Sequence, residues 1–165
     1  MQTPYRRKET YVKPKPDPFL TEAKFLELKN KLERMKASHP ALATEVKRLA
    51  EMGDFSENAG YQDAKHKLRG LNQRILELEA HLKVAEIFHP NKNINKVQLG
   101  HHVTIETGGK EKTYTILGGS ETDPTAGIIS HSSPIGAAIL NHSVGDIIKV
   151  IINDKEKIYK ILKIF

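Results

Sequence analysis

The chain has 165 residues, a net charge of +6 and an aromatic content of only 6%, which suits one or two small domains and favours long solvated helices over one large core. The absence of cysteine excludes disulfide scaffolds, cysteine-ligated zinc and thiol catalysis, and it fits a reducing cytosol. No apolar run approaches the roughly 20 residues that span a bilayer, and the positive charge suggests a polyanion or an acidic protein as partner.

Residues 1–18 form a basic arm with four prolines and five lysines or arginines. Such a composition predicts an extended, largely unpacked segment. A disordered tail is the more common outcome, and an arm that binds nucleic acid is the alternative.

Residues 19–90 carry two heptad seams, and Thr21 with Glu22 predicts the start of the first helix. The first seam is Phe25, Leu28, Leu32, Met35, His39, Leu42, Val46 and Leu49; the second is Tyr61, Ala64, Leu68, Leu71, Ile75, Leu78, Leu82 and Ala85. Read antiparallel, the two seams pair in a constant register, which predicts an antiparallel coiled-coil hairpin about 45 Å long. Pro40 predicts a kink or a short restart within the first helix.

The tip of this hairpin is the sequence MGDFSENAGY, residues 52–61. Asp54 and Glu57 have the spacing of a capping box, and helix capping is the more common role of such a pair. Two carboxylates at the end of a long finger can also carry charge, or a hydrated Mg²⁺, into a site on another molecule.

Basic residues flank the tip, among them Lys65, Arg69 and Arg74 on the second helix. A solvated coiled-coil surface is the more common explanation for such charges. The alternative is that these three residues guide a phosphate backbone towards the tip.

After Pro90, which predicts the end of the second helix, residues 91–98 read as a linker and residues 99–165 as a small domain. We expect an α+β fold overall, with the hairpin followed by this domain. The expected strands are 102–105, 112–117, 147–152 and 157–164, and the expected helix is 134–140. The domain has too few acid–base groups to suggest an enzyme.

The tip sequence Gly53-Asp-Phe-Ser-Glu-Asn-Ala-Gly-Tyr61 resembles the signature of the bacterial GreA/GreB transcript-cleavage factors. The resemblance extends to Gly118-Gly-Ser-Glu-Thr-Asp123, Gly127-Ile-Ile-Ser130, Ser133-Pro-Ile-Gly136 and Val144-Gly-Asp146. Tyr61-Gln62, Lys67-Leu-Arg69 and Met1-x-Thr3-Pro4 are more similar to the GreB branch.

The resemblance implies a coiled coil that enters the secondary channel of bacterial RNA polymerase. Asp54 and Glu57, with Ser56, would act in the polymerase active centre, where the carboxylates help hold an Mg²⁺ that is absent from the free protein. The polymerase, not this chain, would then cleave the 3′ end of backtracked RNA. The domain at 99–165 would be FKBP-like and would dock on the polymerase through Ser133, Pro134, Ile135 and Gly136. The resemblance further implies a cytoplasmic protein, and we expect a monomer.

The chain departs from the family pattern at Gly60, at Thr122 and in its longer basic arm. Gly60 stands where the family usually has a larger residue, which puts the rigidity of the tip in question. Two other functions remain open: a channel-binding regulator without cleavage activity, and a helical-hairpin RNA-binding module unrelated to polymerase.

Overall fold

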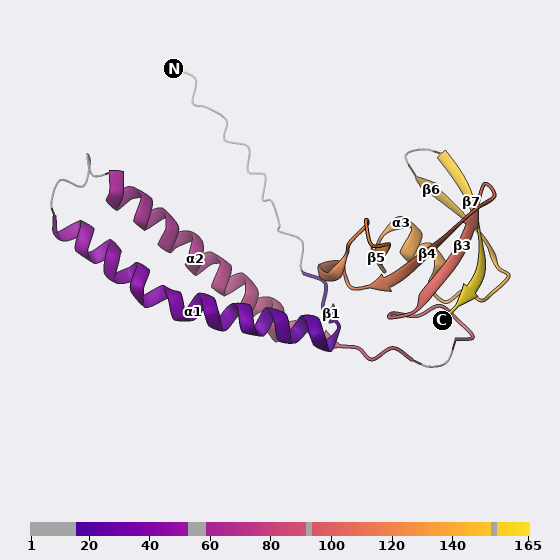
Figure 1. The fold of residues 1–165 in the computed structure, drawn as a ribbon, viewed down its shortest axis with the longest axis horizontal. Helices are drawn as coiled ribbons and strands as arrows, with labels where there is room; N and C mark the ends of the chain where they lie inside the picture. Colours follow the sequence, from indigo (N-terminus) through magenta and orange to yellow (C-terminus); the bar gives the residue numbers. More distant parts are fainter. Residues whose placement is uncertain (1–15, 53–58, 92–93, 153–154) are drawn as a thin grey trace, which may run out of the picture.

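The computed structural model describes residues 16–52, 59–91, 94–152 and 155–165. A long helical hairpin is followed by a strand-rich C-terminal domain at its base (Figure 1). The elements are β1 (Phe19–Leu20), α1 (Glu22–Glu51), α2 (Ala59–Val84), β2 (Glu86–Ile87), β3 (His102–Thr107), β4 (Lys110–Leu117), the 3₁₀ helix η1 (Gly119–Glu121), β5 (Ile128–Ser130), α3 (Pro134–Ile139), β6 (Ile147–Ile152) and β7 (Lys155–Ile164). In the described ranges, no helix is both long and apolar enough to cross a membrane.

The predicted hairpin is confirmed, and its two seams are the faces that α1 and α2 turn towards each other. Every seam residue is buried or half-buried, while most other positions of the two helices are exposed. Leu32 is 7% exposed and Ala64 is 6% exposed. Beside the seam, Lys36 Nζ lies 2.8 Å from Glu79 Oε1. This ion pair joins flanking positions of the two helices and agrees with the predicted register.

The first helix runs without interruption through Pro40, so the predicted restart does not occur. A proline removes one helical N–H, and here seam residues on both sides of it keep the helix packed against α2. Side-chain hydroxyls also bond to carbonyls of this region: Ser38 Oγ donates to Met35 O at 2.8 Å, and Thr44 Oγ1 donates to Pro40 O at 2.9 Å.

The second helix ends at Val84, before the predicted stop at Pro90. The chain turns there into β2, which pairs in parallel with β1. Glu86 N donates to Pro18 O at 2.7 Å, and Phe88 N donates to Leu20 O at 3.1 Å. Neither two-residue strand was predicted, because such short strands have no hydrophobic periodicity to reveal them. The pair closes the base of the hairpin.

The C-terminal domain is a five-stranded sheet in the order β5-β4-β3-β7-β6. All four predicted strands and the predicted helix are present, whereas β5 and η1 were not predicted. The core is aliphatic, with α3 contributing Ile139 to it. Its buried residues are Val97, Val103, Ile105, Ile116, Ile139, Ile148, Val150, Tyr159, Ile161 and Ile164.

The end of the segment predicted as a linker packs into this domain. Val97 is fully buried, and its backbone bonds to His142 O and Asn141 N at 2.8 and 2.9 Å. His101 is 2% exposed; its Nδ1 accepts from Gln98 N at 3.2 Å, and its Nε2 lies 2.8 Å from Asn91 O. Buried hydrogen bonds therefore hold the chain as it enters the sheet.

Replacing Leu32 by alanine should destabilise the hairpin by about 2–4 kcal/mol, because it removes most of a side chain buried between the helices. Leu26→Ala is the matched control: Leu26 is on the same helix but 55% exposed, so its loss should change stability by about 0.5 kcal/mol or less. Chemical denaturation followed by far-UV circular dichroism measures both. Equal changes in stability for the two substitutions would contradict the packing of Leu32 between the helices.

Candidate functional site

Asp54, Ser56 and Glu57 lie outside the described residues, but the structure places the helix ends that flank them. α1 ends at Glu51 and α2 begins at Ala59, at the end of the hairpin farthest from the C-terminal domain (Figure 1). Gly60, the departure from the family pattern, is exposed in the first turn of α2. The carboxylate pair is therefore carried on a short connection between two long helices, and its roles in capping and in metal binding both stay predictions.

Two of the cations near the tip, Arg48 and Lys67, are paired with carboxylates on their own helix. Arg48 Nη2 lies 2.8 Å from Glu45 Oε1, and Lys67 Nζ lies 2.7 Å from Asp63 Oδ2. The hydrogen bond from Arg48 lowers the pKa of Glu45, and the hydrogen bond to Asp63 raises the pKa of Lys67. Each pair joins one positive and one negative side chain, so these pairs add little net charge to the tip region.

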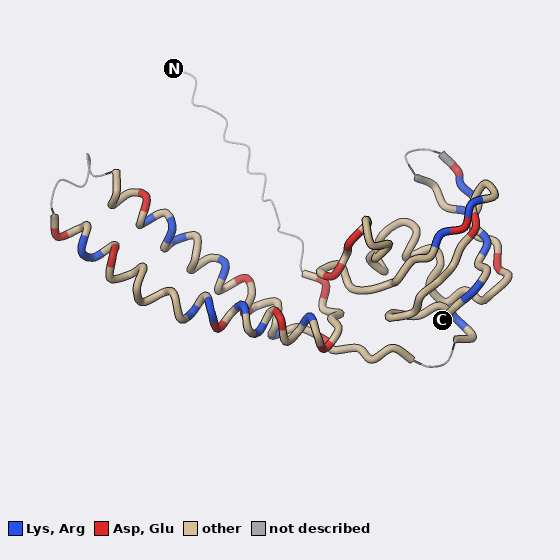
Figure 2. The backbone as a smooth tube through the Cα atoms, in the orientation of Figure 1, with Lys and Arg blue, Asp and Glu red and all other residues tan. Residues whose placement is uncertain are grey.

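Lys65, Arg69 and Arg74 differ from those cations. Lys65 Nζ lies 5.6 Å from the centre of the Tyr61 ring, and within the described residues neither Arg69 nor Arg74 has a carboxylate partner. Figure 2 shows the basic residues along α2. Positive charge on the second helix is therefore available to an anionic ligand.

The helical spacing divides these three residues between two sides of the seam. Lys65 and Arg69 are four residues apart and share a face of α2. Arg74 follows Lys65 by nine positions, which at about 100° per residue places it about half a turn away. A single nucleic-acid strand that follows Lys65 and Arg69 would therefore not meet Arg74 on the same face.

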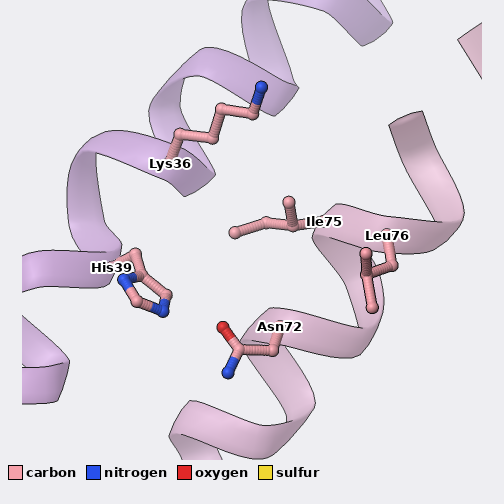
Figure 3. Close-up of a pocket in the computed structure, with 5 residues that line it drawn as sticks. All are labelled: Lys36, His39, Asn72, Ile75 and Leu76. Atoms are coloured by element: carbon pink, nitrogen blue, oxygen red, sulfur yellow. The ribbon is translucent and has the colours of Figure 1, made fainter.

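A shallow groove of about 450 Å³ lies between the helices at the middle of the hairpin (Figure 3). Its lining residues are Lys36, His39, Asn72, Ile75 and Leu76. His39 is the polar member of the first seam, and Figure 3 shows its ring and the Asn72 amide facing the space between the helices. The lining contains no carboxylate, and the ammonium group of Lys36 is paired with Glu79, so we interpret the groove as a packing gap and not as a catalytic site.

The predicted docking residues stand at the start of α3. Ser133 is the N-cap: its Oγ accepts from Gly136 N at 3.1 Å and donates to Ser130 O at 2.7 Å. Gly136 is buried, and a Cβ there would collide with Ser130 O. Ile135 packs against the core, whereas Pro134 is exposed. Three of these residues thus shape the loop and Pro134 is exposed on it. Docking through these residues stays a prediction.

Elsewhere in the described part of the chain, no group of three or more histidine and carboxylate side chains could hold a metal ion. Asp123 accepts from Thr125 Oγ1 at 2.6 Å and from two backbone N–H groups, and these bonds lower its pKa. The backbone N–H of Ser143 and the ring of His142 lower the pKa of Asp146 in the same way. Both carboxylates stabilise turns.

Sequence analysis missed two carboxylates that join the hairpin to the C-terminal domain, Asp17 and Glu121. The Asp17 side chain accepts from Gly119 N at 2.6 Å, and Glu121 accepts from both the N–H and the hydroxyl of Thr21. Asp17 lies in the basic arm at 1–18, and Glu121 lies in the motif at 118–123. Their partners are about 100 residues away in the chain, so no local pattern reveals the contacts.

Comparison with known proteins finds a match along nearly the whole chain. Residues 18–87 match the family described as "Transcription elongation factor, N-terminal", and residues 91–165 match "Transcription elongation factor, GreA/GreB, C-term". The transcription elongation factor GreA of Treponema pallidum (strain Nichols) is 35% identical over 76% of this chain and 79% of its own. The GreA of Thermomicrobium roseum is 39% identical over 70% and 76%, respectively.

Among solved structures, GreA factor homolog 1 (Gfh1) of Thermus thermophilus is 26% identical. The match covers 89% of this chain and 97% of that protein, with a TM-score of 0.42. The sequence matches confirm the resemblance to the GreA/GreB family. They do not separate the two branches, so the likeness to GreB stays a prediction.

Ser133→Ala should destabilise the C-terminal domain by about 1 kcal/mol, because it removes the cap of α3. Ser132→Ala is the control: its hydroxyl is exposed and bonds only to Ser130 Oγ, so its loss should cost less. Denaturant titrations of both variants give the comparison. If the two proteins were equally stable, the cap would not hold this loop.

Proposed function

The chain belongs to the GreA/GreB family of transcription elongation factors, and we propose that it stimulates cleavage of the 3′ end of backtracked RNA by bacterial RNA polymerase. The observation that carries the proposal is a pair of carboxylates in the stretch that joins two long antiparallel helices. The hairpin enters the secondary channel of the polymerase, and Asp54, Ser56 and Glu57 reach the active centre. The protein thus acts in the cytoplasm, where the polymerase is found.

The carboxylates of Asp54 and Glu57 suit Mg²⁺, because hard cations prefer oxygen ligands and Mg²⁺ is often held by one or two carboxylates. An Mg²⁺ bound there would activate water or stabilise the leaving oxygen of the RNA. The chain supplies negative charge and oxygen ligands from outside the polymerase. It needs no cofactor when free, and it is not a nuclease on its own.

The face of α2 with Lys65 and Arg69 contacts the phosphates of the extruded RNA. Both side chains are on the half of α2 near the tip, and the ion pairs of this region leave them available. Exposed cations attract a phosphate backbone without reading its sequence. Arg74, on the other flank, contributes less to this path.

The C-terminal domain docks the factor on the polymerase through the loop that presents Pro134. Docking raises the effective concentration of the tip in the channel. One copy is sufficient for this arrangement, which agrees with the expected monomer. The assay is to add the protein to a backtracked elongation complex and follow shortening of the RNA from its 3′ end. Binding without shortening would instead support a regulator, and no binding would support an unrelated hairpin module.

Asp54→Asn separates metal binding from helix capping. Asparagine caps a helix nearly as well as aspartate, so stability should change by about 1 kcal/mol or less. A neutral amide is a weaker ligand for a hard cation, so cleavage should fall strongly and recover in part at higher Mg²⁺. Cleavage rates against Mg²⁺ concentration measure this effect.

Asp63→Asn is the matched control for Asp54→Asn. It makes the same change in the second turn of α2, where the Asp63 carboxylate pairs with Lys67. Cleavage by this control should remain near that of the wild type. A fully active Asp54→Asn protein at low Mg²⁺ would return Asp54 to a capping role.

The double variant Lys65→Ala/Arg69→Ala should weaken crosslinking to the RNA 3′ segment. It should also make the slope of cleavage activity against salt concentration, on logarithmic axes, shallower by about the contribution of two phosphate contacts. Arg74→Ala should have a smaller effect, since it is on the other flank. Lys67→Ala is the control for lost charge, because Lys67 is already paired with Asp63. Unchanged crosslinking in the double variant would overturn the assignment of this face.

A further inference from the structure

The hairpin meets the C-terminal domain at a junction formed by residues 17–21 on one side and by residues 118–121 and His131 on the other. β1 is the strand of the hairpin that faces η1, and it also pairs with β2 at the end of the second helix. Figure 1 shows β1 between the base of the hairpin and the C-terminal domain. The contacts of this junction therefore act on both helices of the hairpin.

Glu121 binds the start of α1 with both carboxylate oxygens. Its Oε1 accepts from Thr21 N at 2.7 Å, and its Oε2 accepts from Thr21 Oγ1 at 2.6 Å. Thr21 is itself the N-cap of α1, where its Oγ1 accepts from Lys24 N at 3.2 Å. The charge of Glu121 also lies at the positive end of the helix dipole. A carboxylate of one domain thus completes the cap of a 30-residue helix in the other.

Asp17 makes a second set of bonds across the junction. Its Oδ2 accepts from Gly119 N at 2.6 Å, and its Oδ1 accepts from Phe19 N at 3.1 Å. His131 Nδ1 lies 3.2 Å from Oδ2, and the Asp17 side chain is only 15% exposed. The carbonyl of Asp17 lies 2.9 Å from Nε2 of His81, in the last turn of α2. One residue therefore contacts the C-terminal domain and the second helix together.

Close packing restricts the junction further. A Cβ at Gly118 would collide with the carbonyl oxygen of Phe19, so only glycine fits this contact. The rings of Phe19 and His131 meet edge to face, with centroids 5.5 Å apart. Directional hydrogen bonds and close contact together oppose tilting of the hairpin.

We propose that Asp17 and Glu121 are positioning residues, which fix the direction of the hairpin relative to the C-terminal domain. An arm of 30 residues is about 45 Å long, so a tilt of about 10° at the base moves the tip by about 8 Å. A misplacement of catalytic groups by about 1 Å can already slow a reaction by a factor of about 100. Once the C-terminal domain is docked, the junction thus determines where the tip carboxylates lie. This consequence for cleavage rests on the proposed function, whereas the fixed direction of the hairpin does not depend on it.

The fixed direction is tested by the distance between spin labels on the two domains, measured by pulsed electron paramagnetic resonance. The chain has no cysteine, so Ala41→Cys on α1 and Lys110→Cys on β4, both exposed, provide unique labelling sites. In the otherwise unchanged chain the distance distribution should be narrow. Glu121→Ala and Asp17→Ala should broaden it, and Glu121→Gln, which keeps one acceptor oxygen, should broaden it less.

Asp123→Ala is the matched control, because it removes a carboxylate from the same segment that bonds only within its own turn. Its distribution should stay narrow. Circular dichroism should show the same helix content in all variants, which separates tilting from unfolding. A distribution in Glu121→Ala as narrow as in the control would overturn the proposal.

The effect on activity is tested by cleavage of backtracked RNA over a range of factor concentrations. Glu121→Ala should lower the rate at saturation by about tenfold or more, since a misplacement of about 1 Å can cost a factor of about 100. Its half-saturating concentration should change little, because Pro134 and its loop are intact. A broadened distribution with an unchanged saturated rate would overturn the positioning role. Failure of the unchanged protein to stimulate cleavage would overturn the proposed function alone.

Discussion

The packing of α1 against α2 along one narrow seam determines what the rest of the molecule can do. Two helices have no interior beyond the side chains between them, so each layer of the seam contributes directly to the stability of the hairpin. Leu32 and Ala64 are the most buried of these residues. This simple packing produces a long and narrow structure, because two helices keep a small cross-section along their entire length.

The proposed function places the chemistry outside the protein's own fold, which suits this narrow shape. The groove at His39 contains no carboxylate, and the carboxylates of Asp123 and Asp146 are hydrogen-bonded within their own turns. In the proposed function, the carboxylates of Asp54 and Glu57, which belong to the stretch between the two helices, serve a site that another protein completes. The C-terminal domain has a mostly aliphatic buried core, and in the same proposal it attaches the factor to the polymerase. The proposal thus assigns reach and attachment to two different parts of the chain.

Sequence periodicity was sufficient to predict the elements whose residues repeat a pattern. The heptads of α1 and α2 identified the seam positions that the structure buries, and the run of β-branched residues at 147–152 identified β6 with its bounds. The uninterrupted α1 was not predicted, because packing against α2 outweighs the local effect of Pro40. β1 and β2 were missed because two residues contain no period.

In the candidate site, too, residues in local motifs could be predicted from the sequence, and residues defined by tertiary contacts could not. The tip acids were found from a local motif, and the spacing of Lys65 and Arg69 correctly placed them on one face. Asp17 and Glu121 could not be found, because their partners are set by the tertiary structure. Asp17 even falls in the segment predicted to be an unpacked arm. Ser133 was expected to contact a partner, and the structure adds a role in capping α3.

The parallel pairing of β1 with β2 brings the two ends of the hairpin to the same place. The hairpin therefore has a closed base and begins and ends at one attachment point. Adding one heptad to each helix would lengthen it by about 10 Å and leave every bond at that base unchanged. Reach can then vary among proteins built on this plan in steps of whole heptads, while the attachment and its direction stay the same.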